Sequence, residues 1–126
     1  MANDPKTVMI VEDEPDAAEL FAEMMRVSGY RVLKAHASTL AMKLIAQHKP
    51  DAVILDIMMP DISGVEILRY MRREAALARI PVIVVSAKSL PSDVQEGLNA
   101  GASIYLTKPV GFTDLKNAVE RALKDS

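Results

Sequence analysis

The most regular feature of the chain is a series of short, continuous apolar runs separated by longer segments of mixed polarity. Four runs are strongly apolar, at residues 8–11, 52–55, 82–85 and 104–106, and a weaker one lies at residues 30–33. A strand that is apolar at every position is buried on both faces, which is typical of a parallel sheet covered by helices on either side. The runs therefore predict five parallel strands with helices between them.

The intervening segments carry apolar residues at helical spacing. The buried stripes we expect are Ala17, Leu20, Phe21 and Met24; Leu40, Ala41, Leu44 and Ile45; Val65, Leu68, Met71 and Ala75; and Leu115, Val119, Ala122 and Leu123. A further helix is expected at about residues 91–100, and it is the least apolar of the set. Pro15 suits the first turn of a helix, and Gly29 and Gly101 stand where a left-handed residue commonly ends one. The order is β-α, repeated five times.

This alternation predicts an α/β fold of the flavodoxin-like type. We expect a three-layer αβα arrangement around a doubly wound, five-stranded parallel sheet, (βα)5, with strand order 2-1-3-4-5. No Ser/Gly-rich linker, low-complexity stretch or charge block interrupts the pattern. We therefore expect residues 1–126 to form a single domain with its core at about residues 6–124, and no output domain in this chain.

Composition narrows the function classes. The chain has no cysteine, so it offers no thiol chemistry, and this composition suits a reducing cytoplasm. Fifteen basic and seventeen acidic side chains give a formal net charge of −2, which argues against nucleic acid as a partner. No apolar run approaches the ~20 residues needed to span a bilayer, and the N-terminal segment does not have the pattern of a signal peptide. We expect a cytoplasmic protein without membrane association.

Candidate chemistry lies at the ends of the predicted strands. Glu12 and Asp13 follow the first strand, Asp56 the third, Ser86 the fourth and Lys108 the fifth. The carboxyl ends of parallel strands share one edge of the sheet, and ligands bind there where the winding reverses. Carboxylates that converge would repel one another, so a divalent cation is expected to neutralise them. Oxygen donors without Cys or His favour Mg²⁺, with Mn²⁺ as a substitute.

These groups suit phosphoryl transfer to a carboxylate. A carboxylate can attack phosphorus when metal and cationic groups neutralise the phosphoryl oxygens. Asp56 is the expected nucleophile, and Glu12 and Asp13 would hold the metal. Lys108 would pair with one phosphoryl oxygen, and the Ser86 hydroxyl would donate to another. The bond between Lys108 and Pro109 could be cis or trans, which the sequence leaves open.

Four segments carry a family resemblance: VMIVEDEP, DAVILDIMMPDISG, PVIVVSA and YLTKP. With them the chain resembles the receiver domains of response regulators in two-component systems, in particular single-domain receivers of the chemotaxis type. The resemblance implies that Asp56 is the phospho-acceptor and that the backbone carbonyl of Met58 is a further metal ligand. It also implies that Tyr105 turns inward when Ser86 moves toward the phosphoryl group, which would remodel the surface of the fourth helix, fifth strand and fifth helix.

The expected function is therefore a phosphorelay switch. Its donor would be a sensor histidine kinase or a histidine phosphotransfer protein, and its downstream protein target is unknown. Catalysis would be self-directed, with no separate substrate. Two alternatives stay open: a receiver-like binding module that works without phosphorylation, and a Mg²⁺-dependent hydrolase with an aspartyl-phosphate intermediate. The first is disfavoured because no acidic, hydroxyl or lysine group is missing, and the second because no segment is long enough for a lid.

Several acidic residues near these motifs have structural interpretations. Glu14 and Asp16 are expected to favour the positive end of a helix dipole, so we leave them out of the metal site. Asp61 and Gly64 follow Pro60 in a loop, where Asp and Gly more often serve turn geometry than catalysis.

Overall fold

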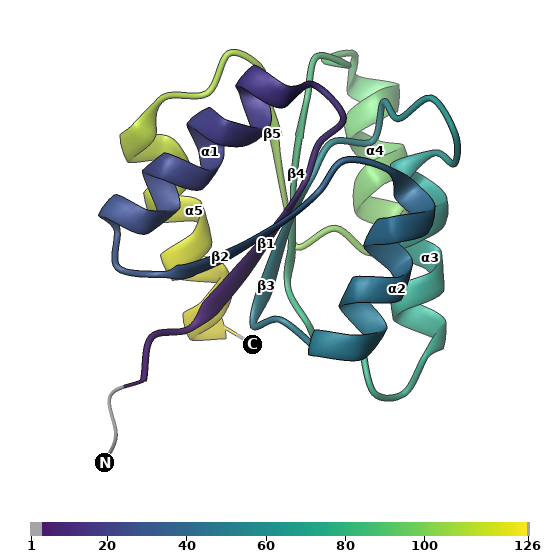
Figure 1. The fold of residues 1–126 in the computed structure, drawn as a ribbon. Coiled ribbons are helices and arrows are strands. Elements are labelled where there is room, and N and C mark those ends of the chain that lie inside the picture. Colours follow the sequence, from purple (N-terminus) through teal and green to yellow (C-terminus); the bar gives the residue numbers. More distant parts are fainter. Residues whose placement is uncertain (1–3, 126) are drawn as a thin grey trace.

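The computed structural model describes residues 4–125 and contains five strands and five helices in alternation (Figure 1). The strands are β1 (Thr7–Val11), β2 (Arg31–Ala35), β3 (Ala52–Leu55), β4 (Val82–Ser86) and β5 (Ile104–Thr107). The helices are α1 (Pro15–Val27), α2 (Ser38–His48), α3 (Gly64–Arg73), α4 (Pro91–Ala100) and α5 (Phe112–Asp125). The predicted strands are confirmed, with ends that differ by up to two residues. None of the helices in this described range combines the length and apolarity that a membrane span requires.

The strands form one parallel sheet in the order β2-β1-β3-β4-β5, which confirms the predicted topology. Helices α1 and α5 cover one face, and α2, α3 and α4 cover the other (Figure 1). β1 is followed by the edge strand β2 beside it, and the chain then crosses back past β1 to build β3, β4 and β5 on its other side. The winding therefore reverses between β1 and β3, where a ligand site is expected.

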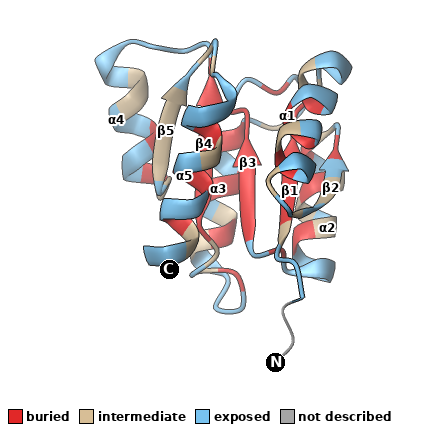
Figure 2. Ribbon diagram, turned by 90° about the vertical axis from the view of Figure 1, so that its left-hand side faces the viewer, coloured by how far each residue is buried: buried red, intermediate tan, exposed pale blue. Residues whose placement is uncertain are grey.

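The sheet separates two apolar layers. Along β1, Val8 and Ile10 point to the layer under α1 and α5, whereas Met9 and Val11 point to the layer under α2, α3 and α4. Every residue of β3 and β4 is buried, while Ile104, Tyr105 and Leu106 of β5 are only partly covered (Figure 2). This explains why the central strands read as continuous apolar runs.

The buried stripe of α1 differs from the predicted one. The residues that face the core are Ala18, Phe21, Ala22 and Met25. Leu20, which we expected to be buried, is 54% exposed, so that part of the prediction is wrong. This helix carries apolar residues on two neighbouring stripes, both at helical spacing, and periodicity alone cannot choose between them.

Helix ends follow the expected chemistry with one exception. Pro15 is the first residue of α1, and Gly29 and Gly101 have positive φ angles of 96° and 118°. Ala75 was expected in the buried stripe of the third helix, but it is exposed because α3 already ends at Arg73. The next residue, Glu74, has extended backbone and does not continue the helix.

Arg72 fastens the end of α3 to its neighbours. Its guanidinium donates to the carbonyl of Gly101 at 2.8 and 3.1 Å, and to the carbonyls of Ala78 and Ile80 at 3.1 and 2.8 Å. Burial lowers the pKa of this arginine below its usual value. One side chain thus provides hydrogen-bond donors for carbonyl groups at the end of α4 and in the loop that leads into β4.

We expect Arg72→Met to lower the free energy of unfolding by about 2–3 kcal/mol, because three carbonyls lose a charged donor that the methionine cannot replace. Urea denaturation followed by far-ultraviolet circular dichroism measures this change. Arg73→Met is the matched control, since Arg73 is the exposed neighbour in the same helix turn, and its effect should stay within about 0.5 kcal/mol. Equal effects of the two substitutions would contradict the anchoring role.

Candidate functional site

The register of the central strands brings the first two candidate residues together. Val11 of β1 pairs with Leu55 of β3, so Glu12 and Asp56 leave neighbouring strands at the same level. The backbone N–H of Asp56 donates to the carbonyl of Val11 at 3.0 Å, which continues the ladder one residue further. Both side chains therefore emerge at the reversal point of the sheet.

The other half of the sheet supplies the hydroxyl and the cation. Ser86 of β4 pairs with Thr107 of β5, and the backbone N–H of Lys108 donates to the carbonyl of Ser86 at 2.8 Å. The bond between Lys108 and Pro109, which the sequence left open, is cis. Ser86 and Lys108 thus lie at the same edge of the sheet as Glu12 and Asp56.

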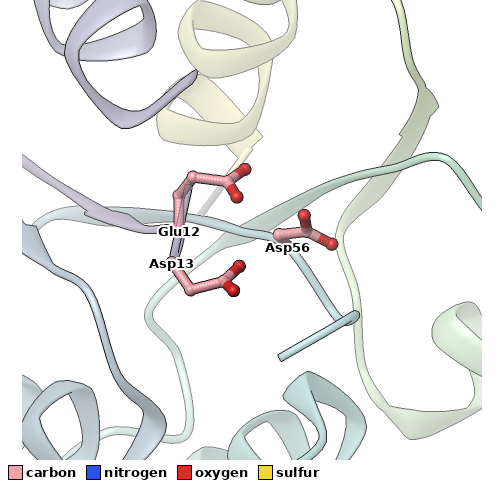
Figure 3. A group of neighbouring side chains, drawn as sticks. All are labelled: Glu12, Asp13 and Asp56. Carbon is pink, nitrogen blue, oxygen red and sulfur yellow. The ribbon is translucent and has the colours of Figure 1, made fainter. Parts of the chain in front are cut away.

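Three carboxylates form a compact acidic cluster at this edge. One oxygen from each of Glu12, Asp13 and Asp56 lies within 4.8 Å of the other two, and the side chains face a common space (Figure 3). Glu12 and Asp56 are only 2% and 7% exposed, and Asp13 is the most open of the three. Because all the donors are oxygens, the cluster could hold a hard divalent cation.

Lys108 bridges the two buried carboxylates. Its Nζ lies 2.9 Å from Oε1 of Glu12 and 3.0 Å from Oδ2 of Asp56. Burial disfavours the charged lysine, but the hydrogen bonds to both carboxylates outweigh this and raise its pKa. For Glu12 the balance is different, because burial raises the pKa of its carboxyl more than the bond to Lys108 lowers it.

Asp56 is held in a fixed orientation. Its Oδ1 accepts a hydrogen bond from the backbone N–H of Met58 at 2.9 Å, while Oδ2 accepts from Lys108. Met58 itself is 49% exposed. The role of the Met58 carbonyl as a metal ligand stays a prediction.

Gly64 supports the acceptor loop in a way that the sequence did not indicate. A Cβ atom built on Gly64 would lie 2.5 Å from Cα of Ile57 and 2.8 Å from the carbonyl oxygen of Asp56. The backbone N–H of Gly64 also donates to the carbonyl of Ile57 at 3.1 Å. Gly64 is therefore required for close backbone packing behind Asp56, rather than for the turn geometry that we expected.

The acidic residues left out of the site have structural partners. The Asp61 carboxylate accepts from the backbone N–H groups of Ser38, at 3.0 Å, and Thr39, at 3.4 Å, where α2 begins. Glu14 caps α1 by accepting from the N–H groups of Asp16 and Ala17 at 2.9 and 3.1 Å. These contacts satisfy free N–H groups in the first turns of two helices, as caps do.

Ser86 and Tyr105 are linked through the loop that follows β4. The buried Oγ of Ser86 accepts from the backbone N–H of Lys88 at 3.1 Å, and the Tyr105 hydroxyl donates to the Lys88 carbonyl at 2.7 Å. Burial raises the pKa of Tyr105. The sequence predicted Ser86 at the end of the fourth strand and Tyr105 in the fifth strand. It did not indicate that the backbone of Lys88 forms hydrogen bonds with both side chains.

Carboxylates and a lysine thus meet at the reversal point of a doubly wound parallel sheet, which is the arrangement that the resemblance to receiver domains implied. The chain belongs to the family described as the response regulator receiver domain, whose family model matches residues 8–120. It is a receiver domain of two-component signalling, in which such domains interact with histidine kinases and downstream targets.

Individual relatives span nearly the whole chain. The polar-differentiation response regulator DivK of Brucella anthropi is 31% identical over 122 residues, which cover 97% of this chain and 99% of the relative. A putative response regulator of Chloroflexus aurantiacus has a crystal structure with a TM-score of 0.92 and 30% identity, covering 96% and 99% of the two chains.

One solved relative contains a metal. The receiver domain of a sensor histidine kinase from Pseudomonas aeruginosa has a magnesium ion coordinated in its active-site cleft. It is 27% identical to this chain, with a TM-score of 0.89 and coverage of 96% and 99% of the two chains.

Proposed function

We propose that a histidine kinase or a histidine phosphotransfer protein donates a phosphoryl group to Asp56 of this chain in a Mg²⁺-dependent reaction. The observation that carries the proposal is the position of the Asp56 carboxylate, which contacts the Lys108 ammonium at 3.0 Å and belongs to the same acidic cluster as Glu12 and Asp13. We propose further that residues of about 6–124 act as one receiver domain, and that the domain acts on itself without a separate substrate.

In the transfer step, a carboxylate oxygen of Asp56 forms a bond to phosphorus as the bond between phosphorus and the donor histidine nitrogen breaks. The imidazole leaves with the electron pair of that bond and takes up a proton. The Met58 N–H holds Asp56 in place for this attack. Lys108 would exchange its contact with Asp56 for one with a phosphoryl oxygen, and the Ser86 hydroxyl would donate to another.

Glu12, Asp13 and Asp56 would hold Mg²⁺, with the Met58 carbonyl as an additional ligand and Mn²⁺ as a substitute. The donor set supports this choice, since it offers carboxylate oxygens and no nitrogen or sulfur. When bound, the cation would neutralise charge on the transferring phosphoryl group.

The output would leave through the surface formed by α4, β5 and α5. Tyr105 lies on β5 and its hydroxyl contacts the loop after Ser86, so movement of Ser86 toward a phosphoryl group would disturb the ring. Phosphorylation would then shift the chain between two arrangements with different affinities for a target protein.

The test is the intact mass of the chain after incubation with acetyl phosphate, run with Mg²⁺ and with EDTA. We expect the gain of one phosphoryl group with Mg²⁺ and none with EDTA. An acyl phosphate is labile to hydroxylamine, so the gain should disappear on that treatment. Absence of any gain, from acetyl phosphate and from a phosphorylated histidine phosphotransfer protein alike, would favour the module that works without phosphorylation.

Mg²⁺ is also expected to stabilise the fold in a pH-dependent manner. Because the pKa of Glu12 is raised above its usual value of 4.5, its contribution to stability in metal-free protein is present at low pH and is lost as pH rises through the raised value. Mg²⁺ binds the ionised form, so its stabilising effect should grow over the same range. At a hundredfold excess over Kd it should reach about 2.7 kcal/mol.

Urea midpoints measured with Mg²⁺ and with EDTA, at several pH values between about 5 and 8, test this linkage. Asp13→Asn should remove most of the Mg²⁺ effect. Asp16→Asn is the matched control and should keep it, because Asp16 lies in the first turn of α1 outside the acidic cluster. A Mg²⁺ effect that does not change with pH would contradict a site built on Glu12.

A further inference from the structure

Gly97 is an unusual residue for its position. It lies within α4, between residues that are exposed, and it is itself buried. Glycine is among the least favourable residues inside a helix because it loses the most conformational freedom on folding. Its backbone does not have the positive φ that would require glycine. The reason for a glycine must therefore lie in what surrounds it.

The ring of Tyr105 occupies the space that a side chain at Gly97 would need. A Cβ atom built on Gly97 would lie 2.8 Å from both Cδ2 and Cε2 of Tyr105. Both atoms belong to one edge of a rigid ring, so the contact cannot be relieved by bending a flexible end. The ring lies directly against the helix backbone.

The ring is also tied on its other side. Its hydroxyl donates to the Lys88 carbonyl at 2.7 Å, and the N–H of Lys88 donates to Ser86 Oγ at 3.1 Å. A ring pushed away from Gly97 would have to strain or break the bond to Lys88. The contacts thus form a continuous connection from α4, through Tyr105 and Lys88, to the buried hydroxyl of Ser86.

We propose that Gly97 is a positioning residue for the aromatic switch: its missing side chain makes the space under α4 that holds the Tyr105 ring against Lys88. Any larger residue at this position displaces the ring and biases the surface of α4 and β5 toward the displaced arrangement. The link from ring position to signalling rests on the proposed function, whereas the packing of Gly97 against Tyr105 does not.

A double-mutant cycle tests the packing. Gly97→Ala should lower the urea midpoint when Tyr105 is present, because the new methyl group collides with the ring. In the Tyr105→Ala background the same substitution should raise the midpoint, because alanine favours the helix and nothing obstructs it. This reversal of sign separates a collision with Tyr105 from a general defect in folding. Equal effects in the two backgrounds would overturn the proposal.

Two further variants sharpen the cycle. Gly111→Ala is the matched control, because a Cβ atom built there would meet no atom within 4 Å, and its effect should be the same in both backgrounds. Tyr105→Phe keeps the ring but removes the bond to Lys88. Gly97→Ala should cost less in that background than in the wild type, because the ring can then move aside without losing a hydrogen bond.

Fluorine NMR tests the consequence for switching. The chain has three tyrosines, so 3-fluorotyrosine labelling gives three signals, and Tyr105→Phe assigns the one of interest. In the wild type this signal should shift on phosphorylation with acetyl phosphate and Mg²⁺. In Gly97→Ala it should be shifted beforehand and should lose most of its response, while the gain in mass is retained. A wild-type response in this variant would overturn the proposal. Failure of the wild type to gain mass would contradict the proposed function instead, and the stability cycle would still decide the packing.

Discussion

Replacing Asp56 with asparagine is expected to abolish the Mg²⁺-dependent gain in mass from acetyl phosphate. The amide has nearly the same shape and can still accept the hydrogen bond from the Met58 N–H. It lacks the negative charge that makes the carboxylate a nucleophile toward phosphorus. The loss should therefore be complete, while the fold is retained. Intact-protein mass spectrometry of the two proteins under identical conditions measures it.

Asp114→Asn provides the control for this result, since Asp114 is an exposed carboxylate in the first turn of α5. It should leave the phosphoryl gain unchanged. If Asp56→Asn still gained a phosphoryl group, the acceptor would be a different residue. Fragmentation of the modified chain would then show whether it is one of the other two carboxylates of the cluster.

The fold could be predicted because its strands are simple in composition. β3 and β4 are buried at every position, and such continuous apolar runs indicate a parallel sheet with covered faces. The strand order 2-1-3-4-5 was then expected because it is a common order in doubly wound parallel sheets. α1 was harder, because Leu20 and its neighbours make a second apolar stripe. Only the packing against the sheet decides that Phe21 and Met25 face the core and Leu20 faces outward.

The residues of the site could be predicted because they stand directly after strands. In a parallel sheet this position fixes where a side chain emerges, so Glu12, Asp56 and Lys108 were placed together before any contact was known. The bridging geometry confirms that placement: one ammonium group lies within 3.0 Å of both carboxylates. Their chemical roles were not fixed in this way and remain proposals.

The close packing of neighbouring groups against two glycines could not be predicted from the sequence. Gly64 and Gly97 have no side chain to carry a pattern, and neither has the positive φ that would suggest a special turn. Each is explained only by what lies beside it, the backbone after Asp56 in one case and the Tyr105 ring in the other. Close approach depends on the relative position of two elements, which periodicity does not determine.

The C-terminal end of α4, the helix that contains Gly97, is held by a contact that does not involve Tyr105. Arg72 of α3 binds the carbonyl of Gly101, where α4 terminates, while Tyr105 contacts the middle of the same helix. The end of α4 is therefore anchored to the rest of the fold independently of the phosphoryl site. Within this arrangement, a change in ring position would alter the middle and start of α4 more than its end.

Replacing Lys108 with methionine should slow Mg²⁺-dependent phosphorylation by about 10²–10³-fold, the usual cost of removing one preorganised charged donor from a transferring group. Methionine has a similar length and keeps the apolar part of the side chain, so the change isolates the ammonium. The initial rate of mass gain from acetyl phosphate measures the effect. Lys43→Met, on the exposed face of α2, is the matched control and should react at the wild-type rate.

The stability of the same variant, measured with and without Mg²⁺, distinguishes a loss of charge stabilisation in the transfer step from general damage to the site. Lys108 is the cation that pairs with Glu12 and Asp56 in the metal-free protein, so its removal leaves two buried carboxylates without a positively charged partner. The metal-free variant should therefore be less stable than the wild type, and Mg²⁺ should restore more stability to it than to the wild type. Slow phosphorylation together with strong Mg²⁺ stabilisation would place the role of Lys108 in the transfer step. A wild-type rate would show that Lys108 serves only to neutralise the two carboxylates before the metal binds.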